Sequence, residues 1–210
     1  ENPMRRLLLA AASLVLAIPM AGSAPAPAAD APRPLLWKLS DADSSVYLLG
    51  SFHLLKKSDY PLSADVERAL GEAEHVVFEV TPQELADPTV PARMMQRALQ
   101  PGDAAFGKVA AADVAARVNA RLAALGLPAA QLGQFEPWMV SITLVTVLGQ
   151  SLGYSPEDGL DRHLMARAAS LGKSTTGLES LDSQLDALDA TPLAEQLASL
   201  EDTVAEGEDM

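Results

Sequence analysis

The chain has 210 residues, of which 49% are apolar, a formal net charge of −13 at pH 7 and no cysteine. Its length and apolar content are those of a folded domain rather than a disordered chain. The negative charge argues against nucleic acid or an anionic membrane surface as a partner. The lack of cysteine excludes disulfides, thiolate zinc sites and a cysteine nucleophile.

Residues 1–29 have the pattern of a signal peptide. Arginines after Met4 precede an apolar stretch at residues 7–20, and small residues follow as cleavage sites. The stretch is short for a transmembrane helix, which needs about 20 apolar residues, and an uncleaved anchor is the alternative. We therefore expect a periplasmic or secreted bacterial protein with no membrane attachment after cleavage, and we expect residues 30–34 to be a linker.

Short strands open the mature chain. Residues 35–39 and 46–49 flank an Asp- and Ser-rich turn, which predicts a hairpin. Ser63 is the expected N-cap of a helix that ends near Gly71. A third strand is predicted over residues 75–80, and its continuous apolar run predicts burial on both faces.

The pattern becomes helical over residues 91–148. Apolar residues recur at helical spacing in two stripes: Met94, Met95, Ala98 and Leu99, then Val114, Val118, Leu122 and Leu125. Residues 137–148 are apolar almost all round, which predicts a deeply buried helix. Ser155 is the expected N-cap of a helix that ends at Gly172, and a weaker strand at residues 175–178 precedes further helices.

The end of the chain is acidic, because no Lys or Arg follows Lys173. A solvated helical face is one interpretation of this run, and a tail that binds a partner or attracts cations is the other. The sequence ends within a helical pattern with no closing strand. We therefore expect an α/β fold in which a mixed sheet with a helical insert is incomplete in this chain.

Two predicted strands end in residues suited to chemistry. His53 follows the second strand and Gly50, and Glu79 follows the third. Neighbouring strand ends meet at one sheet edge, where a histidine and a carboxylate can form a metal or acid–base site. Gly50 is expected to allow a sharp turn that aims His53 into a cleft. Glu179, after the weaker strand, is a further candidate, although an acid is also favoured in the first turn of a helix.

Other motifs are missing or weak. His75 and His163 are interpreted as structural, and neither belongs to a His-Glu-x-x-His zinc helix. Ser51 lies near His53, but no Gly-x-Ser-x-Gly elbow is present, so a serine hydrolase is not expected. The sequence has no glycine-rich phosphate loop, which argues against a nucleotide-dependent transferase.

Several segments together resemble the TraB/GumN family, which is related to the Tiki metalloproteases and more distantly to the erythromycin-esterase and ChaN-like folds. The resemblance covers roughly residues 35–200 and rests on residues 36–40, 47–54, 77–80, 153–161 and 177–181. It implies an α/β fold and a divalent-metal site made of a Gly-x-x-His histidine, a glutamate after the next strand, and a second Gly-x-x-His near the C-terminus.

His53 matches the first histidine of that site, and Glu79 matches the glutamate. The second Gly-x-x-His does not occur in the 210 residues, because the spacings from Gly71 to His75 and from Gly159 to His163 are each one residue too long. We therefore expect residues 35–210 to form the N-terminal part of a TraB/GumN-like domain without its C-terminal Gly-x-x-His region.

The function expected from this resemblance is an exported, divalent-metal-dependent hydrolase that acts on peptides or on a small molecule. His53 and Glu79 would be its metal ligands and catalytic groups, and Glu179 and Gly50 would support the site. Manganese, cobalt and zinc are the candidate metals. The alternatives are a non-catalytic periplasmic module that binds a signal peptide or an exopolysaccharide-related ligand, and an inactive fragment. The sequence does not indicate an oligomeric state.

Overall fold

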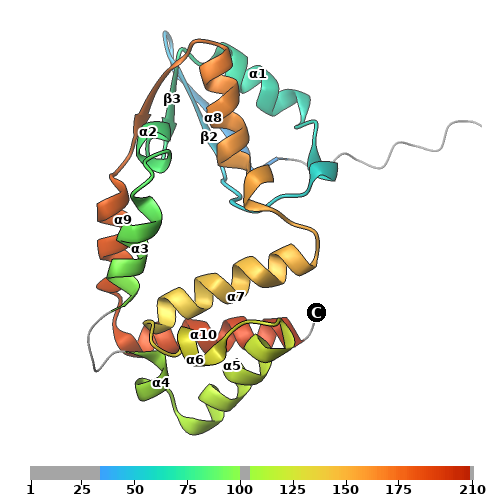
Figure 1. Ribbon diagram of the computed structural model, residues 1–210. Helices are drawn as coiled ribbons and strands as arrows, with labels where there is room; N and C mark the ends of the chain where they lie inside the picture. The colour runs from blue at the N-terminus through green and yellow to red at the C-terminus, as the bar shows by residue number, and fades with distance from the viewer. Residues whose placement is uncertain (1–33, 100–104, 209–210) are drawn as a thin grey trace, which may run out of the picture. The chain divides into compact units, whose positions relative to one another are not determined.

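The computed structural model describes residues 34–99 and 105–208 (Figure 1). The predicted signal peptide and nearly all of the predicted linker lie outside these residues. Within them the chain is a mixed α/β protein with one antiparallel and one parallel pair of strands and no closed sheet. The predicted α/β class is therefore confirmed. No helix in the described ranges is long and apolar enough to cross a membrane.

The predicted hairpin is present. Strand β1 (Leu36–Ser40) pairs antiparallel with β2 (Ser45–Leu49). The Asp41 carboxylate shapes the turn, because it accepts hydrogen bonds from the backbone N–H groups of Asp43 and Ser44 at 3.2 and 2.8 Å. The hairpin is tied to helix α1 (Ala64–Glu72) by Lys38 and Tyr47, whose side chains both contact the Glu72 carboxylate.

The second pair of strands is parallel, β3 (His75–Phe78) with β4 (Ser174–Gly177). The prediction that the third strand is buried on both faces is wrong. Phe78 is buried, but His75 and Val77 on the other face are exposed, so that face is not closely packed. A continuous apolar run thus marked a strand of which only one face is packed.

Serine and threonine caps begin several helices. Ser63 accepts the Val66 N–H at the start of α1, as predicted. Thr81 caps the short helix α2 (Pro82–Leu85) through the Glu84 N–H. A one-turn 3-10 helix, η2 (Lys57–Asp59), lies in the loop between the hairpin and α1. The Ser63 cap explains why α1 begins where the sequence indicates.

A helical core forms from the middle and the end of the chain. It contains α4 (Phe106–Val109), α5 (Ala112–Ala124), α6 (Ala129–Leu132), α7 (Pro137–Ser151) and α10 (Leu193–Glu208), as Figure 1 shows. Its fully or almost fully buried side chains come from α4, α5, α7 and α10: Phe106, Val114, Val118, Leu122, Val140, Leu144, Leu200 and Val204. The predicted second stripe is confirmed, and Gly126 ends it with a φ of 71°.

Helix α7 was predicted to be deeply buried, but one side of it is exposed. Val140 and Leu144 are buried against α10, but Val145 on the opposite side is 48% exposed. The helix is therefore apolar all round but packed on one face. At its start the buried Glu136 accepts a hydrogen bond from Gln196 of α10, and burial raises the pKa of this carboxyl.

The helix that was predicted to begin after Ser155 begins later in the structure. Ser155 caps a 3-10 turn, η3 (Pro156–Asp158), through the Glu157 N–H, and α8 (Leu160–Ser170) begins only after Gly159. A Cβ atom at Gly159 would collide with the carbonyl oxygen of His53. The break therefore lets the chain approach the loop that carries His53.

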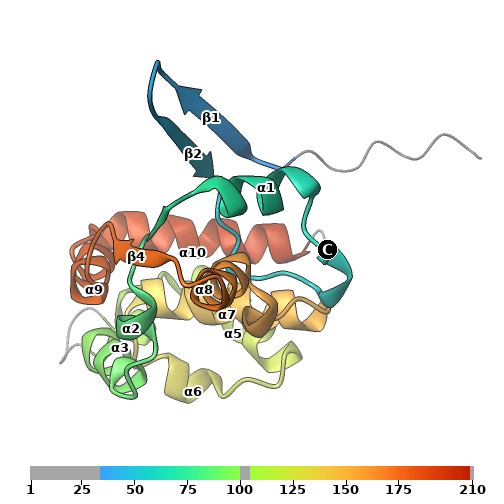
Figure 2. The ribbon, with the colours of Figure 1, turned by 90° about the horizontal axis from the view of Figure 1, so that it is seen from above.

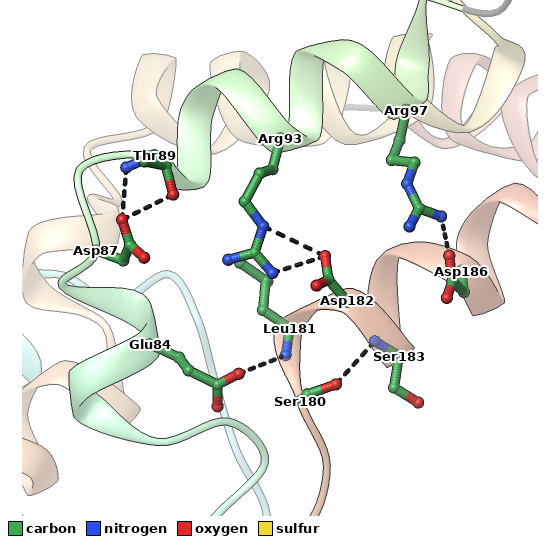
Figure 3. Close-up of polar contacts among 10 residues, drawn as sticks. All are labelled: Glu84, Asp87, Thr89, Arg93, Arg97, Ser180, Leu181, Asp182, Ser183 and Asp186. Atoms are coloured by element: carbon green, nitrogen blue, oxygen red, sulfur yellow. Dashed lines mark hydrogen bonds and ion pairs between the residues drawn. The ribbon is translucent and has the colours of Figure 1, made fainter.

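Helices α3 (Val90–Ala98) and α9 (Leu181–Asp189) lie side by side and are joined by ion pairs (Figure 3). Arg93 pairs with Asp182 at 2.6 Å, and Arg97 pairs with Asp186. Part of the acidic run is thus paired with α3 rather than only solvated. The predicted stripe on α3 is only partly confirmed, because Ala98 is buried while Met95 is 48% exposed.

Candidate functional site

The loop after β2 carries His53 and is held by the start of α8. The Leu160 N–H donates to the carbonyl oxygen of Phe52 at 2.8 Å, and an isolated antiparallel bridge pairs Leu55 with Ser155. These backbone contacts place Asp161, the second residue of α8, next to His53. Gly50 is not in the left-handed region, which corrects the predicted sharp turn. A Cβ at Gly50 would instead lie 3.1 Å from the Cβ of Leu35.

Glu79 directly follows the end of β3, as the sequence predicts. Residues that follow β4 in the chain hold its main chain and its side chain. Its carbonyl oxygen accepts the Glu179 N–H at 3.0 Å, which continues the contact between the ends of β3 and β4. Its carboxylate accepts a hydrogen bond from Gln184 Nε2 of α9 at 3.3 Å. The orientation of Glu79 thus depends on residues about 100 positions later in the chain.

His53 lies between two carboxylates, in the order Asp161–His53–Glu79, and these three residues are called the row below. His53 Nδ1 is 2.8 Å from Asp161 Oδ2, and His53 Nε2 is 4.0 Å from Glu79 Oε2. The side chain of Asp161 is 22% exposed, whereas those of His53 and Glu79 are 72% and 49% exposed. The histidine is therefore anchored at one nitrogen by the most enclosed carboxylate and faces a more accessible carboxylate with the other.

The charges of this row follow from its hydrogen bonds. Burial acts to raise the pKa of Asp161, but the hydrogen bonds from His53 and Ser51 hold it below its usual value. An ionised Asp161 can only accept, so Nδ1 of His53 carries a proton and donates it. The same hydrogen bond raises the pKa of His53 above 6.5, with a smaller contribution from the charge of Glu79. In the neutral ring, Nε2 is then free to accept a proton or bind a cation.

Ser51 does not act here as a serine nucleophile would. Its hydroxyl donates to Oδ2 of Asp161, the same oxygen that receives His53. In a Ser-His-Asp triad the histidine stands between the serine and the aspartate. Here the aspartate stands between the other two, which agrees with the expectation from the sequence that this is not a serine hydrolase.

A pocket of about 280 Å³ opens beside this row. His53, Glu79 and Asp161 supply its polar side, together with Gln184 and Arg162. Apolar side chains complete the wall: Val80, Leu85 and Met165. This volume can take one or two side chains or a short stretch of a polymer.

The structure brings together two of the four site residues that the sequence predicts. His53 and Glu79 line the pocket, while Gly50 and Glu179 do not. The other histidines lie elsewhere: His75 is hydrogen-bonded to Ser174 and Thr176 of β4, and the ring of His163 lies 4.5 Å from that of Tyr60.

Asp161 and Gln184 are the site residues that sequence reasoning missed. Asp161 lies in one of the segments that carry the family resemblance, but an acid in the first turn of a helix is favoured for electrostatic reasons alone. Gln184 gave no signal, because it lies on a helix whose approach to Glu79 depends on tertiary packing.

The donor atoms of His53 and Glu79 are of the types that bind divalent cations. An imidazole nitrogen and a carboxylate oxygen are common ligands of divalent transition metals, and a carboxylate on the far nitrogen is the usual support of a histidine ligand. Within residues 34–99 and 105–208, no group of three or more His, Cys, Asp or Glu side chains has the arrangement of a metal cluster. His53 and Glu79 would thus provide two ligands, and Asp161 would orient the first.

The fold and this pocket define a mixed α/β protein with a histidine–carboxylate site at the ends of its strands. The model of the TraB/PrgY/gumN family matches residues 35–210, and the chain belongs to that family. This confirms the resemblance found in the sequence. A comparison with curated proteins gave no match, and neither did a comparison with solved structures.

Proposed function

We propose that this protein is an exported, divalent-metal-dependent hydrolase of peptide bonds. The observation that carries the proposal is the row Asp161–His53–Glu79, in which Nε2 of His53 and the Glu79 carboxylate face each other at 4.0 Å beside a pocket. Export rests on the signal-peptide pattern of residues 1–29.

Each residue has a distinct role in this proposal. Asp161 keeps the proton on Nδ1 of His53, so that Nε2 presents its lone pair to the pocket. Ser51 supports the ionised state of Asp161 by donating to it. Gln184 fixes the direction of the Glu79 carboxylate, which either binds the cation with His53 or accepts a proton from the attacking water.

A divalent cation held by His53 and Glu79 would supply Lewis acidity toward a scissile carbonyl group. Manganese, cobalt and zinc remain the candidates, since all three accept nitrogen and oxygen ligands. The apolar wall of the pocket suits an apolar side chain next to the scissile bond. Peptides are therefore the first substrates to test.

The test measures cation binding and hydrolysis with matched histidine variants. The 210-residue chain and its His53→Ala, Glu79→Gln and His75→Ala variants are titrated calorimetrically with Mn²⁺, Co²⁺ and Zn²⁺ and then incubated with a peptide panel. His75 is the control, because it is an exposed histidine bonded to β4 outside the pocket. Cation binding and hydrolysis should be lost in the first two variants only. Equal binding by His53→Ala would contradict the proposal.

A non-catalytic binding module is the second candidate. It is favoured by the small number of ligand side chains, since no group of three or more is found among the described residues. This alternative predicts saturable binding of a signal peptide or of an exopolysaccharide fragment that persists in His53→Ala and Glu79→Gln, without hydrolysis in any variant.

A further inference from the structure

Arg162 is the only Lys or Arg among the described residues that line the pocket beside His53. It lies in the first turn of α8, directly after Asp161, and its side chain is exposed. Met165 follows three residues later on the same side of the helix and also lines the pocket. Helix α8 therefore supplies both a guanidinium group and an apolar side chain to one wall.

The charge of Arg162 has no ion-pair partner in the part of the chain that the structure describes. Five other arginines of that part each pair with an Asp or Glu: Arg68, Arg93, Arg97, Arg117 and Arg167. The Glu157 carboxylate, on which Arg162 acts at longer range, is hydrogen-bonded by the Ser155 hydroxyl instead. A cation in the first turn of a helix also opposes the helix dipole. Neither an ion pair nor the dipole therefore accounts for an arginine at this position.

The charged groups of the pocket differ in what they already contact. Asp161 accepts hydrogen bonds from His53 and Ser51, and Glu79 accepts one from Gln184. Arg162 has five N–H donors and no acceptor, and a guanidinium group binds a carboxylate with two parallel hydrogen bonds. The group that complements Arg162 is therefore a carboxylate of a ligand.

The rest of the pocket specifies what accompanies this carboxylate. Its apolar wall of Val80, Leu85 and Met165 suits an apolar side chain, and its volume of about 280 Å³ holds one or two side chains. Asp161, which orients His53, precedes Arg162 directly, and consecutive Cα atoms are about 3.8 Å apart. A carboxylate on Arg162 would therefore lie close to a carbonyl group held at His53.

We infer that Arg162 binds a carboxylate of the substrate beside the scissile bond, so that the preferred substrate is a peptide with an apolar residue and a carboxylate at this place. The carboxylate belongs either to the free C-terminus of the peptide or to an Asp or Glu side chain next to the apolar residue. This inference deepens the proposed hydrolase function and rests on it for the scissile bond. Arg162 determines specificity in it, because it contacts the substrate away from the reacting atoms.

The test compares two pairs of short peptides with acetylated N-termini. The first pair is alanyl-alanyl-leucine with a free C-terminal carboxylate and the same peptide with a C-terminal amide. The second pair, both amidated, is alanyl-leucyl-glutamate and alanyl-leucyl-glutamine. Binding to the 210-residue chain is measured by NMR titration without added metal, so that cleavage does not interfere. The variants are Arg162→Gln, Arg162→Lys and, as a control, Arg68→Gln, which changes an exposed arginine of α1 outside the pocket.

The peptide with the recognised carboxylate should bind the unmutated chain about five- to tenfold more tightly than its neutral counterpart, as one charge-assisted contact predicts. Arg162→Gln should abolish this preference, and Arg68→Gln should keep it. Arg162→Lys should keep part of it, because an ammonium group retains the charge without the two parallel donors. Because the Arg162 side chain is exposed, Arg162→Gln should unfold at the same temperature as the unmutated chain. The pair of peptides that shows the preference identifies the source of the carboxylate.

The outcomes separate this inference from the hydrolase proposal. A preference for the carboxylate that depends on Arg162, while the metal-loaded chain cleaves no peptide, would support the Arg162 contact and contradict the hydrolase. A preference in neither pair, or one that Arg162→Gln retains, would overturn the inference even if peptides are hydrolysed. Where hydrolysis occurs, Arg162→Gln should raise KM for the peptide with the carboxylate and leave KM for its neutral counterpart unchanged. Equal changes in the two KM values would also overturn the inference.

Discussion

The helical core and the strand region of this protein differ in how completely they bury their apolar residues. In the helical core, Val118, Leu122 and Val140 are fully buried. In the β1–β2 hairpin, which Figure 2 shows beyond α1, Trp37 and Leu48 remain 56% and 54% exposed. The helical core therefore supplies most of the hydrophobic stabilisation, and the strand region leaves more apolar surface exposed.

The candidate site lies in the less buried region. His53 and Glu79 follow strands that each have one edge unpaired within residues 34–99 and 105–208, whereas the groups that orient them come from α8 and α9. Binding sites are often drawn from the parts of a fold with the lowest local stability. The following predictions test whether stability and function are divided in this way.

The largest effect should come from Leu144→Ala. This side chain is 1% exposed in the helical core, and its truncation should reduce the free energy of unfolding by about 2–5 kcal/mol. Leu48→Ala removes the same atoms from the hairpin, where the side chain is 54% exposed, and should cost about 0.5 kcal/mol or less. Urea denaturation of the two variants makes the comparison. Similar losses would show that the hairpin is covered in solution.

Gly159→Ala should have the next largest effect. The new methyl group would collide with the His53 carbonyl oxygen, so the variant should lose about 1–3 kcal/mol and displace His53. Gly71→Ala is the control: it lies in α1 with no heavy atom within 4 Å of the added Cβ and should gain about 0.5–1 kcal/mol. Urea denaturation and the NMR shifts of the His53 ring measure both changes. An unmoved His53 ring in Gly159→Ala would contradict the close packing of Gly159 against the His53 carbonyl group.

Asp161→Asn should change the titration of His53 more than the stability of the fold. Removing the carboxylate removes the main cause of the raised pKa of His53, which should fall toward or below 6.5. Because the folded-state pKa of His53 is raised, its stabilising contribution is complete below the unfolded pKa and is lost as pH rises through the folded one. In Asp161→Asn this loss with rising pH should be smaller.

NMR titration of the His53 ring in the unmutated chain and in Asp161→Asn measures this shift. An unchanged His53 titration in Asp161→Asn would show that the hydrogen bond between them does not persist in solution.

The smallest effect should come from the ion pair between α3 and α9. A double-mutant cycle on Arg93 and Asp182 should give a small favourable coupling, since Asp182 is 56% exposed. The coupling should diminish at about 1 M salt, where the screening length is about 3 Å. The pair Arg68–Asp65 within α1, with 61% and 58% exposure, should couple still more weakly. Equal coupling in the two cycles would mean that α3–α9 packing adds nothing.

Much of the local structure could be predicted from the sequence. The hairpin followed from two short strand patterns that flank an Asp- and Ser-rich turn, and α1 followed from the Ser63 cap. The α5 stripe followed from helical spacing and ended at Gly126. In each case the signal lies within a few consecutive residues, so no knowledge of distant contacts was needed.

The remaining features depend on contacts between distant segments. The exposed face of β3 could not be predicted, because a continuous apolar run does not reveal whether a second face has a partner. The late start of α8 follows from the close approach of Gly159 to His53, more than 100 residues apart in sequence. The pairing of His53 with Asp161 has the same origin, whereas His53 and Glu79 were found because each follows a strand.

The site draws equally on the two ends of the described chain, and this has a consequence for synthesis. His53 and Glu79 are translated well before Asp161 and Gln184, the residues that orient them. A nascent chain released before α8 therefore carries a histidine with no fixed tautomer and a glutamate with no fixed direction. The ribosome must complete α9 before His53, Glu79, Asp161 and Gln184 are all present. Early truncation products should therefore show neither cation binding nor hydrolysis at this site.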